Sequence, residues 1–223
     1  MNNPMAAVIS EDHIEQIVIQ EFIDLGYSYV NGADISPDGV AQERAYDEVV
    51  LTHRLLAAIS RLNLTVPADA QEDALKKLLR SDSPNLFQNN YTIHKYLTEG
   101  VDVEYRKGDR IVGDKVWLID YENPTNNEFL VVNQFTIIEN NINKRPDVIL
   151  FINGIPLVVI ELKNAVDENA TIHSAFNQLQ TYKKSIPSLF LYNTLLLVYR
   201  DWETHRYRDW ETDRKSTRLN SSH

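Results

Sequence analysis

Residues 145–163 read RPDVILFINGIPLVVIELK, and this stretch decides the fold. Two short runs rich in valine and isoleucine, residues 148–152 and 157–160, flank the pair Asn153-Gly154. Runs of this length and composition predict strands rather than helices. Because asparagine and glycine both tolerate positive φ, the pair between the runs predicts a β-hairpin.

Three charged side chains meet at the open end of this predicted hairpin. A turn centred on Asn153-Gly154 places Asp147 opposite residue 160 or 161. Glu161 and Lys163 are two residues apart, so their side chains leave the same face of the strand. Carboxylate oxygens are the ligands that Mg²⁺ prefers. A lysine beside them can orient a water molecule or stabilise charge on a phosphate.

The pattern Pro146-Asp147 followed by Glu161-Leu162-Lys163 resembles the PD-(D/E)xK nuclease signature. Each residue also has an ordinary alternative as a turn residue, a cap or an exposed edge pair. The wider pattern resembles the N-terminal endonuclease domain of the R subunit of type I restriction–modification enzymes, over roughly residues 10–199. The motifs that carry it are Asn133-Gln134-Phe135, Arg145-Pro146-Asp147, the turn at residues 153–157, and Glu161-Leu162-Lys163.

This resemblance implies a Mg²⁺-dependent DNA endonuclease. Asp147 and Glu161 would hold the metal together with the carbonyl of Leu162, and Lys163 would position the attacking water or stabilise the developing charge. The implied partners are double-stranded DNA and the methylation and specificity subunits. ATP would be used by two helicase-like motor domains, and we expect the chain to stop before them. The sequence has no Gly-x₄-Gly-Lys-Ser/Thr phosphate loop of its own.

Three further residues resemble supporting positions of such nucleases. Gln178 and Tyr182 form a QxxxY pattern, found after the core motif in this family and in RecB-like nucleases, and they share one face of a predicted helix. The resemblance implies support for Lys163 or contact with DNA; ordinary helix packing is the alternative. Glu15 resembles the acidic residue that such enzymes place near the metal, and a solvated helix residue is the alternative.

Two other functions are open: a stand-alone RecB-like nuclease of repair or defence, and a non-catalytic assembly module. The intact set of Asp147, Glu161 and Lys163 argues against a scaffold, because a scaffold has no physical need for it. The long helical lead-in and the turn at residues 153–157 favour the type I enzyme.

Composition indicates a globular protein of the cytoplasm. The 223 residues are 43% hydrophobic and 24% charged, and they contain no cysteine. No apolar run is long enough to span a membrane, and no signal peptide is evident. The net charge of −10 conflicts with a protein that grips DNA by bulk electrostatics. We therefore expect weak DNA binding, helped locally by the basic side chains Lys144, Arg145, Lys163, Lys183 and Lys184.

Helices are predicted for most of the first hundred residues. The first runs from the cap Ser10 to Gly26, and a loop covers residues 31–40. The next helices are expected over residues 42–62, from Pro67 to about residue 79, and over 86–97. Glu43-Arg44 matches an ER pattern of the family, and a solvated charge pair fits equally well.

The period then changes to that of strands, predicted at residues 101–105, 116–120 and 128–138, with a polar loop at 106–115. Asp120 is expected to be structural. After the hairpin we expect a loop at 164–171, a helix over 172–184 and a mostly buried strand within 189–199. This order predicts an α/β (α+β) fold with a restriction-endonuclease-like core, in which helices flank a mixed sheet. Residues 1–199 would form one domain, with a helical lead-in over about 10–100 and the nuclease core over about 101–199.

The end of the chain carries an imperfect repeat, YRDWETHR followed by YRDWETDR. Its unit of eight residues is shorter than those of real repeat architectures. We therefore expect residues 200–223 to be a non-native tail and exclude them from the fold. Without them the chain remains acidic.

Overall fold

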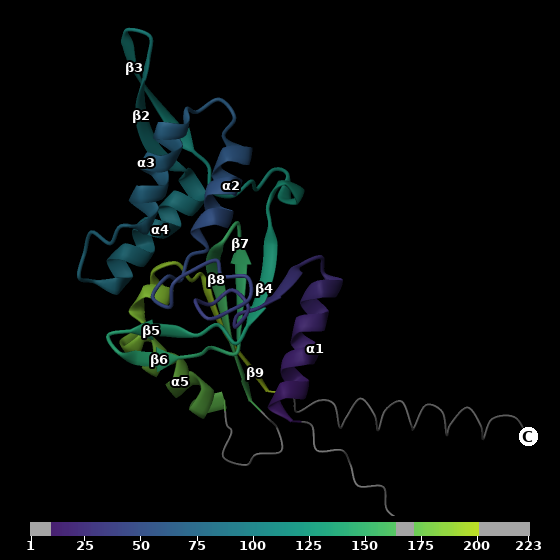
Figure 1. The fold of residues 1–223 in the computed structure, drawn as a ribbon. Coiled ribbons are helices and arrows are strands. Elements are labelled where there is room, and N and C mark those ends of the chain that lie inside the picture. The colour runs from purple at the N-terminus through teal and green to yellow at the C-terminus, as the bar shows by residue number, and fades with distance from the viewer. Residues whose placement is uncertain (1–9, 164–171, 201–223) are drawn as a thin grey trace, which may run out of the picture.

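The computed structural model of the chain describes residues 10–163 and 172–200. At its centre lies a five-stranded mixed sheet with the order β1-β4-β7-β8-β9 (Figure 1). Strand β7 is antiparallel to β4 and β8, and the outer pairs β1–β4 and β8–β9 are parallel. The expected mixed sheet flanked by helices is confirmed. The strands are β1 (Ser28–Asn31), β4 (Phe129–Asn133), β7 (Val148–Ile152), β8 (Ile155–Lys163) and β9 (Leu195–Arg200).

The expected hairpin is β7 and β8. Asn153 and Gly154 have φ values of 51° and 80° and form the turn. The fully buried side chain of Asn153 accepts a hydrogen bond from the Glu128 N–H at 2.8 Å and donates one to the Leu118 carbonyl at 2.8 Å. These hydrogen bonds fix the turn to the segments that contain Leu118 and Glu128, so the position of the hairpin is set at this end.

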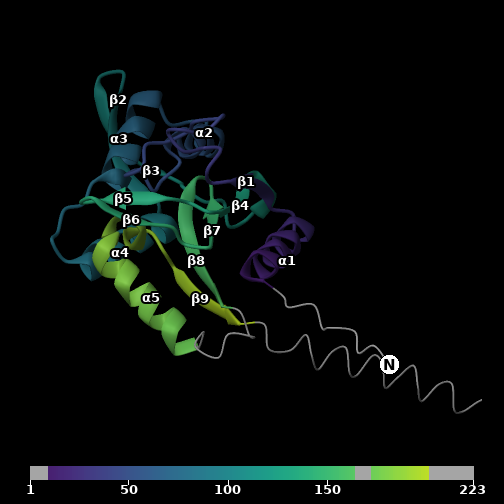
Figure 2. The same ribbon diagram turned by 60° about the horizontal axis from the view of Figure 1, so that its bottom comes forward.

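The sheet is covered on both faces (Figures 1 and 2). Helix α1 (Glu11–Asp24) packs Ile14 and Ile19 on the face that carries Ile160 and Leu162. Helix α5 (Ile172–Ser185) covers the other face, where Leu179 and Tyr182 join the main core with Val159. Because side chains alternate along a strand, Glu161 faces the side of α5.

A helical lobe lies beyond the turn end of the hairpin (Figure 1). Its elements are α2 (Thr52–Leu62), α3 (Ala68–Leu79), α4 (Leu86–Glu99), β2 (Val101–Lys107) and β3 (Arg110–Val116). Asn85 caps α4 through hydrogen bonds from the N–H groups of Phe87 and Gln88, and Gly100 ends it with φ 77°. Smaller elements complete the described chain: η1 (Pro124–Asn126), β5 (Ile137–Glu139), β6 (Ile142–Lys144) and η2 (Pro187–Leu191). None of the helices in residues 10–163 and 172–200 has the length and apolarity to cross a membrane.

Three of the expected elements are wrong in extent. The helix expected over residues 42–62 begins only at Thr52, after an irregular segment. The strand expected at 116–120 does not form beyond Val116. Strand β3 instead occupies most of the expected polar loop at 106–115, and it pairs with β2 through a turn at Gly108, whose φ is 64°. The strand expected over 128–138 is interrupted at Gln134, which has φ 53°.

The outer strands also differ from expectation. Residues 189–199 divide into η2 and β9, and β9 is an edge strand whose Leu195 and Leu197 are 48% and 38% exposed, so it is not mostly buried. Strand β1 was not predicted; it pairs with β4 and comes from the segment expected to be the helical lead-in. The expected loop at 164–171 and residues 201–223 of the expected tail lie outside the described residues.

Candidate active site

The register of the hairpin brings Asp147 beside Glu161, as expected. Val148 pairs with Ile160, and Asp147 directly precedes Val148. The Leu162 N–H donates a hydrogen bond of 2.7 Å to Oδ2 of Asp147, which ties this carboxylate to the outgoing strand.

Glu161 and Lys163 point to the same face of β8 and form an ion pair. Nζ of Lys163 donates to Oε1 of Glu161 at 2.8 Å, with Glu161 fully buried and the lysine side chain 13% exposed. The second oxygen, Oε2 of Glu161, is buried and has no hydrogen-bond partner among the described residues. An unpartnered buried carboxylate oxygen is costly, so this atom marks a place where a ligand would stabilise the protein.

The electrostatics of the pair point to a cation. Burial, and then the charge of Asp147, raise the pKa of Glu161 to about 7, while Lys163 opposes the rise. Two carboxylates side by side with an unpartnered oxygen suit Mg²⁺, which one or two carboxylates plus water molecules can hold. No group of three or more His, Cys, Asp or Glu side chains forms a metal cluster within the described ranges. The candidate ligand set is therefore Asp147, Glu161 and a backbone carbonyl.

Helix α5 brings the expected pair Gln178 and Tyr182 to this face. Nε2 of Gln178 donates to the Tyr182 hydroxyl at 2.6 Å, and Tyr182 is 4% exposed. Burial raises the pKa of Tyr182 to about 12, and the charges of Glu161 and Asp147 add to the rise. The hydroxyl therefore lies near both carboxylates, while the ring packs in the core as the helix-packing alternative expected.

Glu15 does not lie in solvent, so the expectation of a solvated helix residue is wrong. It is 8% exposed. Its Oε1 accepts from Nδ2 of Asn133 and its Oε2 accepts from Nε2 of Gln134, both at 2.7 Å. Asn133 and Gln134 belong to the NQF motif, but the contact of their amides with Glu15 was not predicted.

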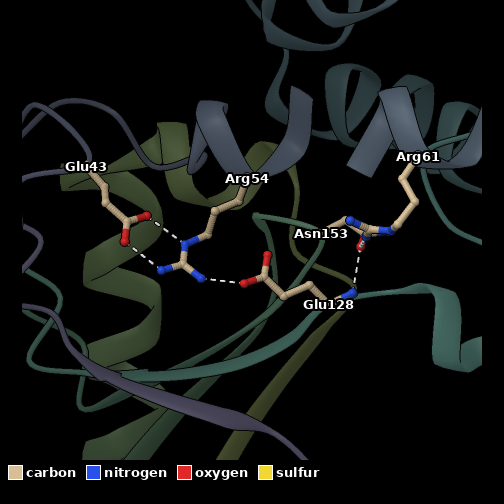
Figure 3. A network of polar contacts seen from close by, with 5 residues as sticks. All are labelled: Glu43, Arg54, Arg61, Glu128 and Asn153. Carbon is tan, nitrogen blue, oxygen red and sulfur yellow. Dashed lines mark hydrogen bonds and ion pairs between the residues drawn. The ribbon is translucent and has the colours of Figure 1, made fainter. Parts of the chain in front are cut away.

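A second polar network lies at the other end of the hairpin, around the turn (Figure 3). Arg54 of α2 pairs with Glu43 at 2.6 Å and also with Glu128, beside an open hollow of about 720 Å³. Glu43 therefore pairs with Arg54 and Arg44 is buried, so the alternative of a solvated Glu43-Arg44 pair is wrong. Because two carboxylates already engage Arg54, we assign this network to structure rather than to ligand binding.

Asp120 is structural, as expected. Its Oδ1 accepts hydrogen bonds from the N–H groups of Glu122 at 3.0 Å and Asn123 at 2.9 Å, and its Oδ2 accepts one from Asn126. These bonds, led by that of Asn123, lower the pKa of Asp120. The carboxylate is thus occupied in holding its own loop.

Comparisons with known proteins agree with the motifs. The family model described as the type I restriction enzyme R protein N terminus matches residues 8–215. The chain is 38% identical to the type I restriction enzyme HindI endonuclease subunit of Haemophilus influenzae over 193 residues, which are 86% of this chain and 18% of that subunit. It is 34% identical to a provisionally named MjaIXP endonuclease subunit of Methanocaldococcus jannaschii over 203 residues, 89% of this chain and 19% of the relative. The chain thus spans about a fifth of these relatives.

Proposed function

The chain belongs to the family of type I restriction enzyme R protein N termini, and from this premise we propose that it is a Mg²⁺-dependent DNA endonuclease domain. One observation carries the proposal. The buried carboxylate of Glu161 lies beside Asp147 and Lys163, and one of its oxygens has no hydrogen-bond partner within residues 10–163 and 172–200. A purely structural module would gain stability by replacing such a group.

Each side chain has a definite role in this proposal. Asp147 and Glu161 hold the metal, and the hydrogen bond from the Leu162 N–H orients Asp147. Bound Mg²⁺ would polarise the scissile phosphate and lower the pKa of a water molecule. Nζ of Lys163, already placed at the carboxylates, donates a hydrogen bond to the attacking water or to the oxygen on which charge develops. Hydrolysis would leave 5′-phosphate and 3′-hydroxyl ends.

We assign Gln178 and Tyr182 a supporting role. The Gln178 amide fixes the Tyr182 hydroxyl, and that hydroxyl can donate to a carboxylate or to a DNA phosphate. Neither residue need touch the metal for this role. The pair would therefore tune the site from α5, while the Tyr182 ring also packs in the core.

The surroundings of this domain are also proposals. The H. influenzae relative is named an endonuclease subunit of a type I restriction enzyme, and this chain covers 18% of it. We propose that the domain works within such a subunit, beside methylation and specificity subunits on double-stranded DNA. ATP-driven translocation would belong to parts of the subunit that this chain does not span.

The first test is Mg²⁺ binding by titration calorimetry, with the wild-type chain compared with Asp147→Ala. We expect weak binding that the substitution abolishes, because Asp147 supplies a ligand. Asp102→Ala is the matched control: Asp102 is an exposed strand carboxylate paired with Lys115, and its loss should leave Mg²⁺ binding unchanged. Equal heats from wild-type and Asp147→Ala proteins, both shown to be folded, would contradict the proposed site.

A further inference from the structure

Residues 133–136 leave the core sheet and pass beside Asp147, the proposed metal ligand. This segment leaves β4 through Gln134, whose φ of 53° is unusual for a residue other than glycine. In this conformation the Gln134 N–H donates a hydrogen bond of 3.2 Å to the backbone carbonyl of Asp147. The position of Asp147 therefore depends on how firmly Gln134 is held.

Glu15 holds this segment from the side of α1. Its two carboxylate oxygens accept one hydrogen bond each, from the side-chain amides of Asn133 and Gln134 at 2.7 Å. The Tyr29 hydroxyl donates to Oδ1 of Asn133 at 3.0 Å, which fixes the orientation of that amide. Both oxygens of Glu15 are thus occupied by neutral donors.

Two further contacts hold the segment. Arg44 is 3% exposed, and its Cζ lies 3.6 Å from the centre of the Phe135 ring. Its guanidinium also donates a hydrogen bond to the Thr136 carbonyl. The Gly32 N–H donates to the Asn133 carbonyl at 2.8 Å, so close that a Cβ at Gly32 would lie 2.6 Å from the same oxygen. Glu15 is therefore the acidic member of a brace that keeps Gln134 in its left-handed conformation.

We propose that Glu15 is a positioning residue that acts through Gln134 on Asp147 and does not itself bind the metal. The inference rests on the proposed function for the role of Asp147. Its geometric part stands apart from that function, because the chain from Glu15 through Gln134 to Asp147 consists of hydrogen bonds within the protein. Loss of a residue that orients a metal ligand through hydrogen bonds typically lowers metal affinity 10–100-fold.

The test compares Glu15→Ala with Glu15→Gln in the 223-residue chain. Glutamine keeps one acceptor for Asn133, and a rotated Gln134 amide can accept from its new N–H group, so both hydrogen bonds survive. In Glu15→Ala we expect the hydrogen of the Gln134 backbone N–H to exchange with solvent at least about tenfold faster than in wild type. We also expect the Mn²⁺ affinity, measured by calorimetry, to fall about tenfold. Glu15→Gln should restore both values, which loss of a direct metal ligand would not allow.

Two further variants make the result decisive. Gln134→Gly keeps the backbone conformation but removes the bond to Glu15, and it should show the same faster exchange even if Glu15→Ala does not fold. Asn90→Ala removes hydrogen bonds to the carbonyls of Phe190, Leu191 and Asn193, and it should lower stability without a local effect at Gln134.

Two results would overturn the inference. The first is a backbone N–H of residue 134 that exchanges at the wild-type rate in both Glu15→Ala and Gln134→Gly. The second is an Mn²⁺ affinity as weak in Glu15→Gln as in Glu15→Ala. If the wild-type chain bound no Mn²⁺, the proposed function would fail. The exchange comparison would still decide whether Glu15 braces Asp147.

Discussion

Glu161 carries a carboxylate with one oxygen hydrogen-bonded to Lys163, and its other oxygen is buried with no partner in the part of the chain that the structure describes. In the metal-free protein this group is ionised at pH 8 against burial and the charge of Asp147, which together raise its pKa to about 7. A raised acid pKa means that folding opposes ionisation, so the charge destabilises the fold above that pH. At the scale of one residue, stability and the proposed metal binding therefore conflict.

Glu161→Gln should raise the free energy of unfolding of the metal-free protein at pH 8 by about 1 kcal/mol, because the raised pKa means that the fold disfavours the charge of Glu161 even with Lys163 beside it. It should also abolish Mg²⁺ binding. Urea unfolding in the presence of EDTA measures the first effect and calorimetry the second. Glu104→Gln, at an exposed position of β2, should change neither. A variant less stable than wild type by more than about 1 kcal/mol would show instead that the ion pair with Lys163 outweighs the cost of burying the Glu161 charge.

Gly154 is a residue for which the sequence and the structure agree. Its φ is 80°, and a Cβ there would lie 2.5 Å from the Leu51 carbonyl oxygen. Gly154→Ala should therefore lower the free energy of unfolding by about 2–4 kcal/mol, through backbone strain and displacement of α2. Thermal unfolding measures this. Gly113→Ala is the matched control, because nothing lies within 4 Å of a Cβ at Gly113; a similar loss in both variants would contradict the explanation.

At the scale of elements, the irregular segment before α2 shows why one predicted helix does not form. Its apolar spacing fits a helix, but the guanidinium of Arg44 takes the carbonyls of Ala45 and Glu48 at 3.0 and 2.9 Å, and the Tyr46 carbonyl accepts from the Ile138 N–H. These carbonyls are thus not available for helical hydrogen bonds. Burial lowers the pKa of Arg44 to about 10, and no periodicity in the sequence reveals that this arginine is buried.

Arg44→Lys should therefore not be a conservative change. An ammonium group can neither reproduce the fork of donors to several carbonyls nor stack in the same way on Phe135. We expect a loss of about 2–3 kcal/mol in the free energy of unfolding, measured with urea. Arg80→Lys is the control, since Arg80 forms an exposed pair with Asp82 and should change stability little. Equal stability of Arg44→Lys and wild type would mean that the guanidinium contacts contribute nothing net.

The other elements also differ in whether a local sequence signal or a distant neighbour determines them. The first helix, α4 and the hairpin were predictable because their signals are local: the helical spacing of apolar residues, the Ser10 cap and the tolerance of Asn153-Gly154 for positive φ. The signature residues Asp147, Glu161 and Lys163 could be placed together because the turn fixes the register to within one residue. A register shift between Leu150 and Phe151 then sets Asp147 opposite Glu161, and the sequence does not reveal that shift. By contrast, β1 and the exposure of β9 depend on parallel neighbours distant in sequence, and the contact of Glu15 with Gln134 spans 119 positions.

At the scale of the whole molecule, the charge balance sets an expectation for DNA binding. The chain carries 22 basic and 32 acidic side chains, so its overall field repels a polyanion. Positive charge near the proposed site is local, with Lys144 and the exposed Arg145 just ahead of Asp147. We infer that this domain can orient a phosphate at the site, and we expect the chain by itself to bind DNA weakly.

The chain alone should therefore bind a 30-base-pair duplex with a dissociation constant weaker than about 10 µM at 150 mM salt, measured by fluorescence anisotropy. Because Arg145 is one of few basic groups near the site, Arg145→Ala should weaken binding at low salt and reduce the slope of log affinity against log salt by about 1. Arg110→Ala removes an equal charge from the exposed start of β3, in the helical lobe, and should leave the slope unchanged. Submicromolar binding by the wild-type chain at 150 mM salt would contradict the expectation of weak binding, because a protein with this excess of acidic side chains would then bind DNA tightly by itself. Equal effects of both substitutions would show that binding follows net charge rather than the site.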